Sequence, residues 1–252
     1  MVDKVSDEDQ LALDHAIERS RLEVVLQSLQ GLDMHPTISH KILHIHSDEN
    51  TFQSITIMWA SKWVQDQVIM RACEKEALAV KLFIKSSEGI GDIAVFRGNL
   101  YEPMCHSIIM RGRTFRLREL GSSNSPKVHT LPRCSRMCYF QTLDEVLGFD
   151  DGVYLKPESR THGAVDALIQ PDILLQVTLS EVHPISGRWF LRAVQALKSS
   201  SKARLLFVVP EESFLSFKRQ RIVNAKKSPN PISEADMTIL EKVPQFALQI
   251  VL

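Results

Sequence analysis

The chain has 252 residues, with 30 Lys and Arg against 30 Asp and Glu, and 44% of it is hydrophobic. This length suits one large or two small domains with a buried core. Zero net charge excludes an overall positive field, so any contact with nucleic acid must come from a local patch. No run of about 18 apolar residues occurs, which argues against a transmembrane span. The four cysteines fit reduced thiols, and the acidic N-terminus argues against a secretory signal.

The N-terminal third is predicted to be mainly helical. Residues 7–29 carry Leu13 and Ile17 on one apolar stripe and are expected to form a helix. The pattern ILHIH around His44 predicts a strand, and residues 55–84 predict a second strand followed by a long amphipathic helix. Histidines 35, 40, 44 and 46 fit either a metal site or ordinary surface residues, and no spacing brings in a third ligand.

The middle of the chain supplies a helix and a basic strand. Residues 90–110 are expected to form a helix with Glu102 and His106 on one face, and Pro103 fits only near a start or a kink. In RGRTFRLREL, Arg116 and Arg118 share one face of a predicted strand. That face suits either DNA phosphates or the solvated side of an edge strand. GSSNSPK then predicts a hairpin loop, and irregular chain with a short helix follows.

Polar residues inside two apolar strands mark a candidate site. GAVDALI is predicted as a strand with Asp166 in its middle, and ILLQVTLS as the next strand, with Gln176 and Thr178 on one face. Burying a polar group without a partner costs on the order of 1–3 kcal/mol. Asp166 and Gln176 are therefore either a functional site or a hydrogen-bonded pair that fixes strand register.

The C-terminal part is predicted to complete the sheet. Residues 188–199 form an expected crossover helix, and RLLFVVP is apolar enough to be a buried strand parallel to ILLQVTLS. Residues 211–220 are predicted as a short helix and residues 243–252 as the last strand. The densest basic patch, expected to contact DNA, consists of Lys218, Arg219, Arg221, Lys226 and Lys227.

Several ordered motifs together resemble the C-terminal part of Crinkler and retrotransposon-hot-spot (RHS) type proteins, over roughly residues 37–252. They are SHKILHI, IAVFRGNLYEPMCHSIIMRGRTFRLREL, LKP…VDALI…LLQVTLSEVHPI and RLLFVVPEESFLSFKRQ. Those proteins join a P-loop ATPase to a nuclease domain of the PD-(D/E)XK restriction-endonuclease superfamily. The resemblance implies an α/β fold with a mixed β-sheet flanked by helices, preceded by a small helical or winged N-terminal segment.

The implied domains are 1–86, resembling the region after the ATPase, and 87–252, the nuclease-like domain. No GxxxxGK[ST] motif occurs, so a P-loop ATPase is expected as a partner or as a missing domain.

The resemblance also implies a catalytic site. Asp166 takes the place of the first acid, and Gln176 and Thr178 stand where the family has a second acid and a lysine. Glu102 matches an acid on the first helix, and His183 is a candidate base. Mg²⁺ or Mn²⁺ would be held by Asp166, Gln176 and Glu102, although Gln176 and Thr178 contribute no charge.

Two functions follow from this resemblance. The first is a nuclease-like effector module that hydrolyses DNA with a divalent metal. The alternative is an inactive nucleic-acid- or protein-binding effector scaffold on the same fold. An intracellular location is expected, with the nucleus as a candidate compartment, and secretion into a host is suggested by the resemblance alone.

Overall fold

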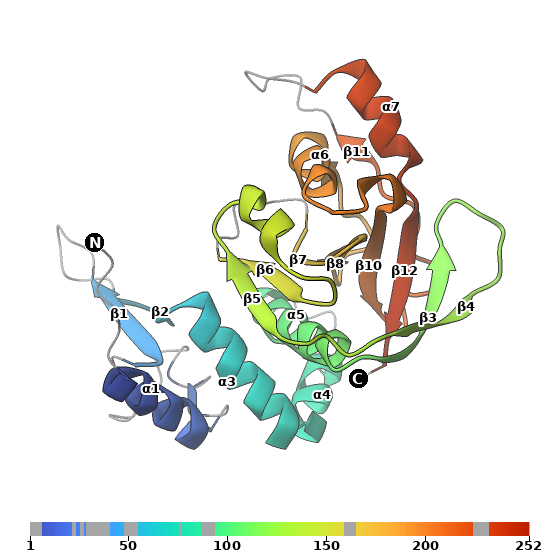
Figure 1. Ribbon diagram of the computed structural model, residues 1–252. Coiled ribbons are helices and arrows are strands. Elements are labelled where there is room, and N and C mark those ends of the chain that lie inside the picture. Colours follow the sequence, from blue (N-terminus) through green and yellow to red (C-terminus); the bar gives the residue numbers. More distant parts are fainter. Residues whose placement is uncertain are drawn as a thin grey trace. The chain divides into compact units, whose positions relative to one another are not determined.

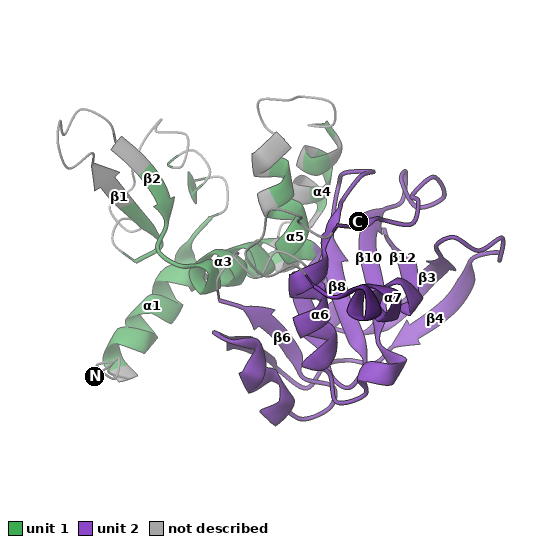
Figure 2. Ribbon diagram, turned by 90° about the horizontal axis from the view of Figure 1, so that it is seen from above, with its two compact units in different colours: residues 1–104 green, residues 105–252 purple. Residues whose placement is uncertain are grey.

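The computed structural model describes residues 7–21, 24–25, 28, 41–47, 55–75, 77–86, 94–158, 165–223 and 232–251. The chain divides into two compact units, residues 1–104 and 105–252, which Figure 2 shows in green and purple. The division lies inside helix α5 (Ala94–Met110). None of the helices in the described ranges is both long enough and apolar enough to cross a membrane.

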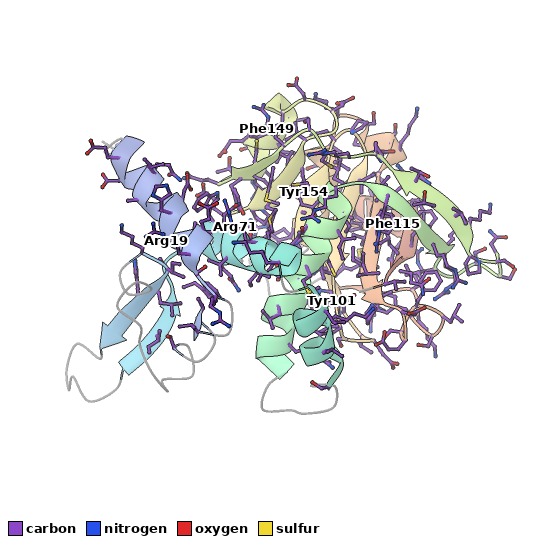
Figure 3. All side chains as sticks on the ribbon, turned by 90° about the horizontal axis from the view of Figure 1, so that it is seen from below. Arg19, Arg71, Tyr101, Phe115, Phe149 and Tyr154 are labelled. Atoms are coloured by element: carbon purple, nitrogen blue, oxygen red, sulfur yellow. The ribbon has the colours of Figure 1, made fainter. Side chains whose placement is uncertain are left out.

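The first unit packs helices and a small hairpin around an apolar core. Its elements are α1 (Asp7–Arg19), β1 (Leu43–Ser47), β2 (Ile55–Trp59), α3 (Lys62–Lys75), α4 (Ala77–Ser86) and the first part of α5. Strands β1 and β2 pair antiparallel. Ile17 of α1 and Val68 of α3 are buried in one cluster with Leu43 of β1. Arg71 of α3 (Figure 3) also bonds Glu18 of α1 at 3.2 Å, so α1 and α3 are joined by apolar and ionic contacts.

Several predictions for this unit are confirmed. The ILHIH and ITIMW patterns are strands, whereas the helix predicted over residues 7–29 begins at Asp7 but ends at Arg19. Histidines 35 and 40 lie outside the described residues. His44 is exposed.

The second unit is built on an eight-stranded mixed sheet (Figure 1), in the order β4-β3-β12-β10-β8-β7-β6-β5. Its strands are β3 (Arg113–Glu119), β4 (Lys127–Leu131), β5 (Met137–Phe140), β6 (Tyr154–Pro157), β7 (Ala167–Ile169), β8 (Ile173–Val177), β10 (Arg204–Pro210) and β12 (Gln245–Ile250). A separate parallel pair is formed by β9 (Ile185–Ser186) and β11 (Ile222–Val223). The helices are the end of α5, α6 (Gly187–Gln195) and α7 (Glu234–Lys242), with 3₁₀ turns η2 (Leu143–Gly148) and η3 (Ser200–Lys202).

The centre of the sheet consists of strands buried on both faces. β8 pairs in parallel with β10, and β10 pairs in parallel with β12. All five β8 residues are buried, as are residues 205–209 of β10. Such continuous apolar runs are typical of parallel strands covered on both sides. The prediction that ILLQVTLS and RLLFVVP are parallel neighbours, with a helix between them in the chain, is therefore confirmed.

The two faces of the sheet carry different packing. Leu155, Leu174 and Phe207 belong to the main core, where Phe190 of α6 and Leu240 of α7 are also buried. Because side chains alternate along a strand, Tyr154 and Lys156 of β6 lie on the opposite face from Leu155. On that face the last turns of α5 approach the sheet, since Nδ1 of His106 lies 2.5 Å from the hydroxyl of Tyr154. Figure 3 shows Tyr154 and Phe115 inside this unit.

Three local predictions are wrong. Residues 211–216 form turns and 217–220 irregular chain, instead of the expected helix. In the described part of GAVDALI, residues 165–169, the strand begins at Ala167, so Asp166 lies just before β7. The Arg116 strand, β3, is flanked by β12 and β4, so it is not at the edge of the sheet. The GSSNSPK hairpin is confirmed as the connection between β3 and β4.

Candidate functional site

Asp166 stands at the end of the β7–β8 hairpin. The two strands pair antiparallel from Ala167 opposite Leu175 to Ile169 opposite Ile173. At Asp166 the backbone still takes part, because its N–H donates to the Leu175 carbonyl at 2.8 Å. β7 begins at the next residue, and at this end of the ladder the Val177 N–H is accepted by the Asp166 side chain instead of a backbone carbonyl.

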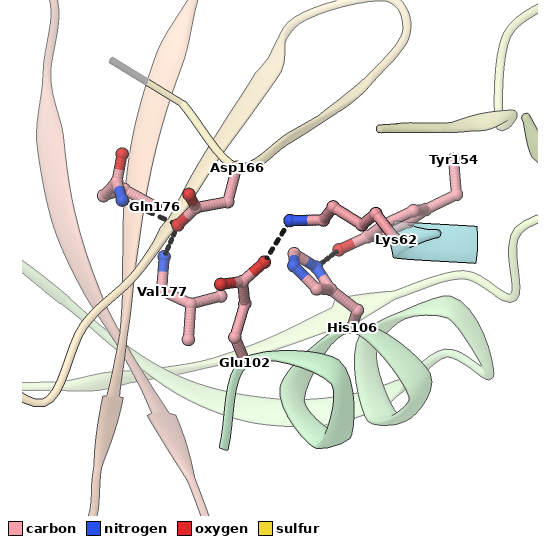
Figure 4. A network of polar contacts seen from close by, with 7 residues as sticks. All are labelled: Lys62, Glu102, His106, Tyr154, Asp166, Gln176 and Val177. Atoms are coloured by element: carbon pink, nitrogen blue, oxygen red, sulfur yellow. Dashed lines mark hydrogen bonds and ion pairs between the residues drawn. The ribbon is translucent and has the colours of Figure 1, made fainter. Parts of the chain in front are cut away.

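The Asp166 carboxylate accepts hydrogen bonds from two groups of β8 (Figure 4). Its Oδ2 atom lies 2.7 Å from the backbone nitrogen of Val177 and 2.6 Å from Nε2 of Gln176. Hydrogen bonds to a carboxylate are about twice as strong as neutral ones. Asp166 therefore fastens β7 to β8 through both a backbone and a side-chain donor.

Gln176 is oriented by its burial. It lies opposite Phe207 of β10, and only 6% of its surface is exposed. Facing residues share one face of a sheet, so the Gln176 amide points toward the face where Phe207 enters the main core. An amide there needs a partner, and the carboxylate of Asp166 takes its N–H. The prediction that these two residues meet is confirmed, with Gln176 as the donor.

The Thr178 hydroxyl is hydrogen-bonded within its own loop. Its hydroxyl accepts the Ser180 N–H at 3.0 Å and donates to the Ser180 carbonyl at 3.3 Å, while its backbone N–H bonds the Val208 carbonyl of β10. This is a local turn closed by a hydroxyl, a common use of threonine after a strand. Thr178 therefore shapes the exit from β8.

His183 belongs to the loop between β8 and β9. Its backbone N–H donates to Oε1 of Gln220 at 2.6 Å, and its ring packs edge-on to Phe207 with centroids 6.4 Å apart. Burial lowers the pKa of His183. The neutral imidazole is thus favoured, and His183 bonds Gln220 through its backbone and packs on Phe207 through its ring.

Glu102 belongs to the first compact unit. Its Oε1 atom lies 2.8 Å from Nζ of Lys62, and both side chains are mostly buried (Figure 4). The pair joins α3 to α5. Pro103 follows it inside α5 without ending the helix. His106, one turn further on, lies in the second unit and contacts Tyr154. Glu102 therefore has a cationic partner of its own.

Three further cations of the second unit, Lys156, Arg188 and Arg192, could in principle replace the lysine that is missing at Thr178, but they lie in other environments. Lys156 is fully buried, on the opposite face of the sheet from the core-facing Gln176. The guanidinium of Arg192 stacks over the Trp189 ring at 5.3 Å, and Arg188 is exposed on α6.

Mg²⁺ prefers an octahedron of oxygen ligands, usually including one or two carboxylates. Within the second unit, the Asp166 site offers one carboxylate, and Gln176 presents its nitrogen to it. Ligation by Gln176 would require the amide to turn over and break the bond to Asp166. Nowhere in the described ranges do three His, Cys, Asp or Glu side chains gather as a metal site would require. The arrangement does not fit the predicted Mg²⁺ or Mn²⁺ centre.

The arginines of β3 hold other parts of the second unit. Arg118 donates to the carbonyls of Phe214 and Phe217, three bonds of 2.5 to 3.2 Å, and both Arg116 and Arg118 lie over the Phe214 ring. These contacts explain why residues 211–217 turn instead of forming a helix, since their carbonyls are bonded by a distant side chain. The predicted phosphate-binding face of β3 is thus largely engaged in packing.

The predicted basic patch is described in part. Lys218, Arg219 and Arg221 are exposed in the segment leading to β11, whereas Phe217, Gln220 and Ile222 point inward. Lys226 and Lys227 lie outside the described residues. This basic segment, residues 218–221, borders an open pocket of about 620 Å³.

Two buried glutamines at this pocket were missed by sequence reasoning. Gln220 and Gln245 exchange bonds: the Gln220 N–H donates to Oε1 of Gln245 at 2.8 Å, and Nε2 of Gln245 donates to the Gln220 carbonyl at 3.0 Å. The only sequence signal was a glutamine within each of two stretches, KRQRI and VPQFA. Nothing in those stretches indicated that they meet.

Comparisons were made with family models, with curated proteins and with solved structures. None of the three finds a match to this chain, so the assignment of function depends on the geometry and on the motif resemblance described above.

Proposed function

We propose that this chain is a Crinkler/RHS-type module that binds nucleic acid on a restriction-endonuclease-like α/β scaffold and does not hydrolyse it. The observation that carries the proposal is the bonding of Asp166. Its Oδ2 atom accepts from Gln176 and from the Val177 backbone, so the acid that would bind metal instead closes the β7–β8 hairpin.

The order of elements supports the scaffold. An antiparallel meander, β6–β7–β8, is followed by α6 and then by β10, which returns parallel to β8. This mixed sheet agrees with what the motif resemblance implies. A shared scaffold does not fix chemistry, because catalysis depends on the residues grafted on it.

The basic segment supports binding. Lys218, Arg219 and Arg221 are exposed, and Arg221 makes no side-chain bond within the described residues. Guanidinium groups exposed in this way can pair with phosphate oxygens. Because the net charge of the whole chain is zero, such binding would be local and would weaken as salt rises.

A second candidate, metal-dependent cleavage of DNA, is favoured by one observation. Asp166 and Gln176 meet at the end of a hairpin, in the relation that the motif resemblance implies for the first and second acids. Cleavage would need the Gln176 amide to present oxygen, and a further anionic ligand besides Asp166.

One experiment separates the two candidates. Plasmid nicking in Mg²⁺ and in Mn²⁺ is measured for the wild type, Asp166→Ala and the double variant Gln176→Glu/Thr178→Lys, together with binding to labelled DNA. We expect the wild type to bind DNA and to nick no more than Asp166→Ala. Nicking by the wild type that Asp166→Ala abolishes would establish the nuclease and overturn the proposal. Absence of DNA binding would also overturn the proposal, because the chain is proposed to bind nucleic acid.

A further inference from the structure

The pocket beside the basic segment has a volume of about 620 Å³. Its lining residues come from the segment before β11, from β11, from helix α7 and from the first residue of β12, all in the second unit. Ligand pockets of small molecules usually measure about 300–1,000 Å³, so a mononucleotide-sized group fits. The pocket is distinct from the Asp166 hairpin in the residues that line it.

One arginine of the pocket is held in place by α7. Nη2 of Arg219 donates to the Glu241 carbonyl at 2.6 Å and to the Val243 carbonyl at 3.5 Å, which satisfies the C-terminal end of that helix. Arginine has five N–H donors. Within the described residues, Nε and Nη1 of Arg219 donate to no protein atom, so they remain available to a ligand.

The second arginine of the pocket, Arg221, makes no side-chain hydrogen bond to a described residue. Arg221 is exposed, and its guanidinium has no partner among the residues that the structure describes. It lines the same pocket as Arg219. Two guanidinium groups on one wall form a site for a dianion, and phosphate matches their planar donor geometry.

The floor of the pocket is rigid and its polar atoms are occupied. Gln220 and Gln245 bond each other, and Nε2 of Gln220 also donates to the carbonyls of Glu181 and Lys218 at 3.0 and 2.8 Å. A floor without spare donors positions the arginines beside it. Recognition therefore depends on the walls.

The lining of the pocket also offers an apolar surface and an acceptor. Ile222 and Met237 line the pocket with Glu241, whose carboxylate makes no ion pair with any described residue. A flat base can pack on methionine and isoleucine side chains, and a carboxylate accepts a hydrogen bond from an amino group. Adenine, cytosine and guanine carry such a group, whereas uracil does not.

From these features we infer that the pocket binds one unpaired nucleotide of a nucleic acid strand. Its phosphate contacts Arg219 and Arg221, and its base lies against Ile222 and Met237 with an amino group toward Glu241. This inference rests on the proposed function and adds a ligand class to it: single strands and strand ends, in which a nucleotide is free to enter a pocket.

Titration calorimetry on the intact chain tests the pocket with CMP, UMP, cytidine and inorganic phosphate. We expect CMP to bind more tightly than cytidine or phosphate alone, and more tightly than UMP. Arg221→Gln should weaken CMP binding by about tenfold, the effect of one charge-assisted bond. The matched control Arg133→Gln changes an exposed arginine that is distant in sequence from the pocket, and it should leave CMP binding unchanged. Glu241→Gln should reduce the difference between CMP and UMP.

Several outcomes would overturn the inference. They are phosphate binding as tightly as CMP, Arg221→Gln binding CMP like the wild type, and an aspartate-rich peptide competing equally with CMP. Thermal melting of Arg221→Gln confirms that it is folded.

Fluorescence anisotropy with short single-stranded and duplex DNA of the same sequence separates this inference from the proposed function. We expect the single strand to bind more tightly, and Arg221→Gln to reduce that preference. Duplex binding without CMP binding would contradict the assignment of the pocket as a nucleotide site but would still agree with the proposed function. CMP binding without any oligonucleotide binding would contradict the proposed function and the assignment of the pocket to strands.

Discussion

The Asp166 hairpin and the Arg219–Arg221 pocket both combine polar side chains with apolar surroundings, yet they differ in how their bonds are distributed. At the hairpin, each strong donor meets an acceptor of the same unit: Gln176 and Val177 both bond Asp166. At the pocket, Arg219 is anchored by one nitrogen only, and Arg221 is anchored by none within the described residues. Saturated buried polarity indicates a structural role, whereas unsatisfied donors around a cavity indicate binding.

The largest effect is expected from Asp166→Ala. It leaves the Gln176 amide and the Val177 N–H without their acceptor in a mostly buried place, and losing charge-assisted bonds costs about 2–4 kcal/mol. Urea denaturation would measure the free energy of unfolding. The exposed Asp150→Ala is the control, expected to change it by less than about 0.5 kcal/mol. A stable Asp166→Ala protein would break the comparison, because the hairpin would then not depend on its carboxylate.

The Gln176→Glu variant tests the comparison through the pH dependence of stability. Two carboxylates at this distance repel, so the pKa of the pair should rise in the folded state above the unfolded value of about 4.3. Because the pKa is higher in the folded state, stability is lost as pH rises from about 4.3 toward the folded pKa. The melting temperature of Gln176→Glu should therefore fall further below that of wild type at neutral pH than at acidic pH. The uncharged Gln176→Met variant should show no such pH dependence.

Replacing His183 should have an intermediate effect on stability, and the effect should depend on pH in the opposite direction to that of Gln176→Glu. Burial lowers its pKa in the folded state, so the unfolded chain binds more protons below about 6.5. Stability is therefore fully present above that pH and declines as pH falls below it. His183→Asn should lose part of this decline in thermal melts between neutral and mildly acidic pH. His129, whose pKa is also lowered by burial, should contribute in the same direction.

The smallest effects distinguish the two arginines of the pocket. Arg219→Gln removes bonds to the end of α7 and should destabilise the protein by about 1 kcal/mol. Arg221→Gln removes no bond to a described residue and should change stability by less than about 0.5 kcal/mol. Both should weaken nucleotide binding. If Arg221→Gln destabilised the fold as much as Arg219→Gln, the pocket would be structural like the hairpin.

The parts of the fold that could be predicted from the sequence are those determined by local patterns. The apolar runs of β8, β10 and β12 indicated buried strands, and GSSNSPK indicated a hairpin. Residues 211–220 misled because Phe214 and Phe217 have helical spacing. Their carbonyls are bonded by Arg118, nearly a hundred residues earlier.

The site was predictable to the same extent. Asp166 and Gln176 were expected to meet because they lie on successive strands, and they do. Gln176 is the donor because an ionised carboxylate can only accept, whereas the burial that holds the amide in place, opposite Phe207, is a contact made by a third strand. The pocket depends on Gln220 and Gln245, which are 25 residues apart and whose stretches carry no motif. Long-range bonds of this kind leave no periodic signal in a single sequence.

The exchange between Gln220 and Gln245 has a consequence for how this protein can change over evolutionary time. The Gln245 side chain bonds the backbone N–H and carbonyl of Gln220, while the Gln220 side chain bonds the His183 N–H and the carbonyls of Glu181 and Lys218. A mutation at either position leaves buried backbone groups without a partner, and because every residue carries those backbone groups, a second mutation at the other position cannot compensate. In a set of related chains, glutamine should therefore be retained independently at positions 220 and 245, while position 221 varies with the ligand.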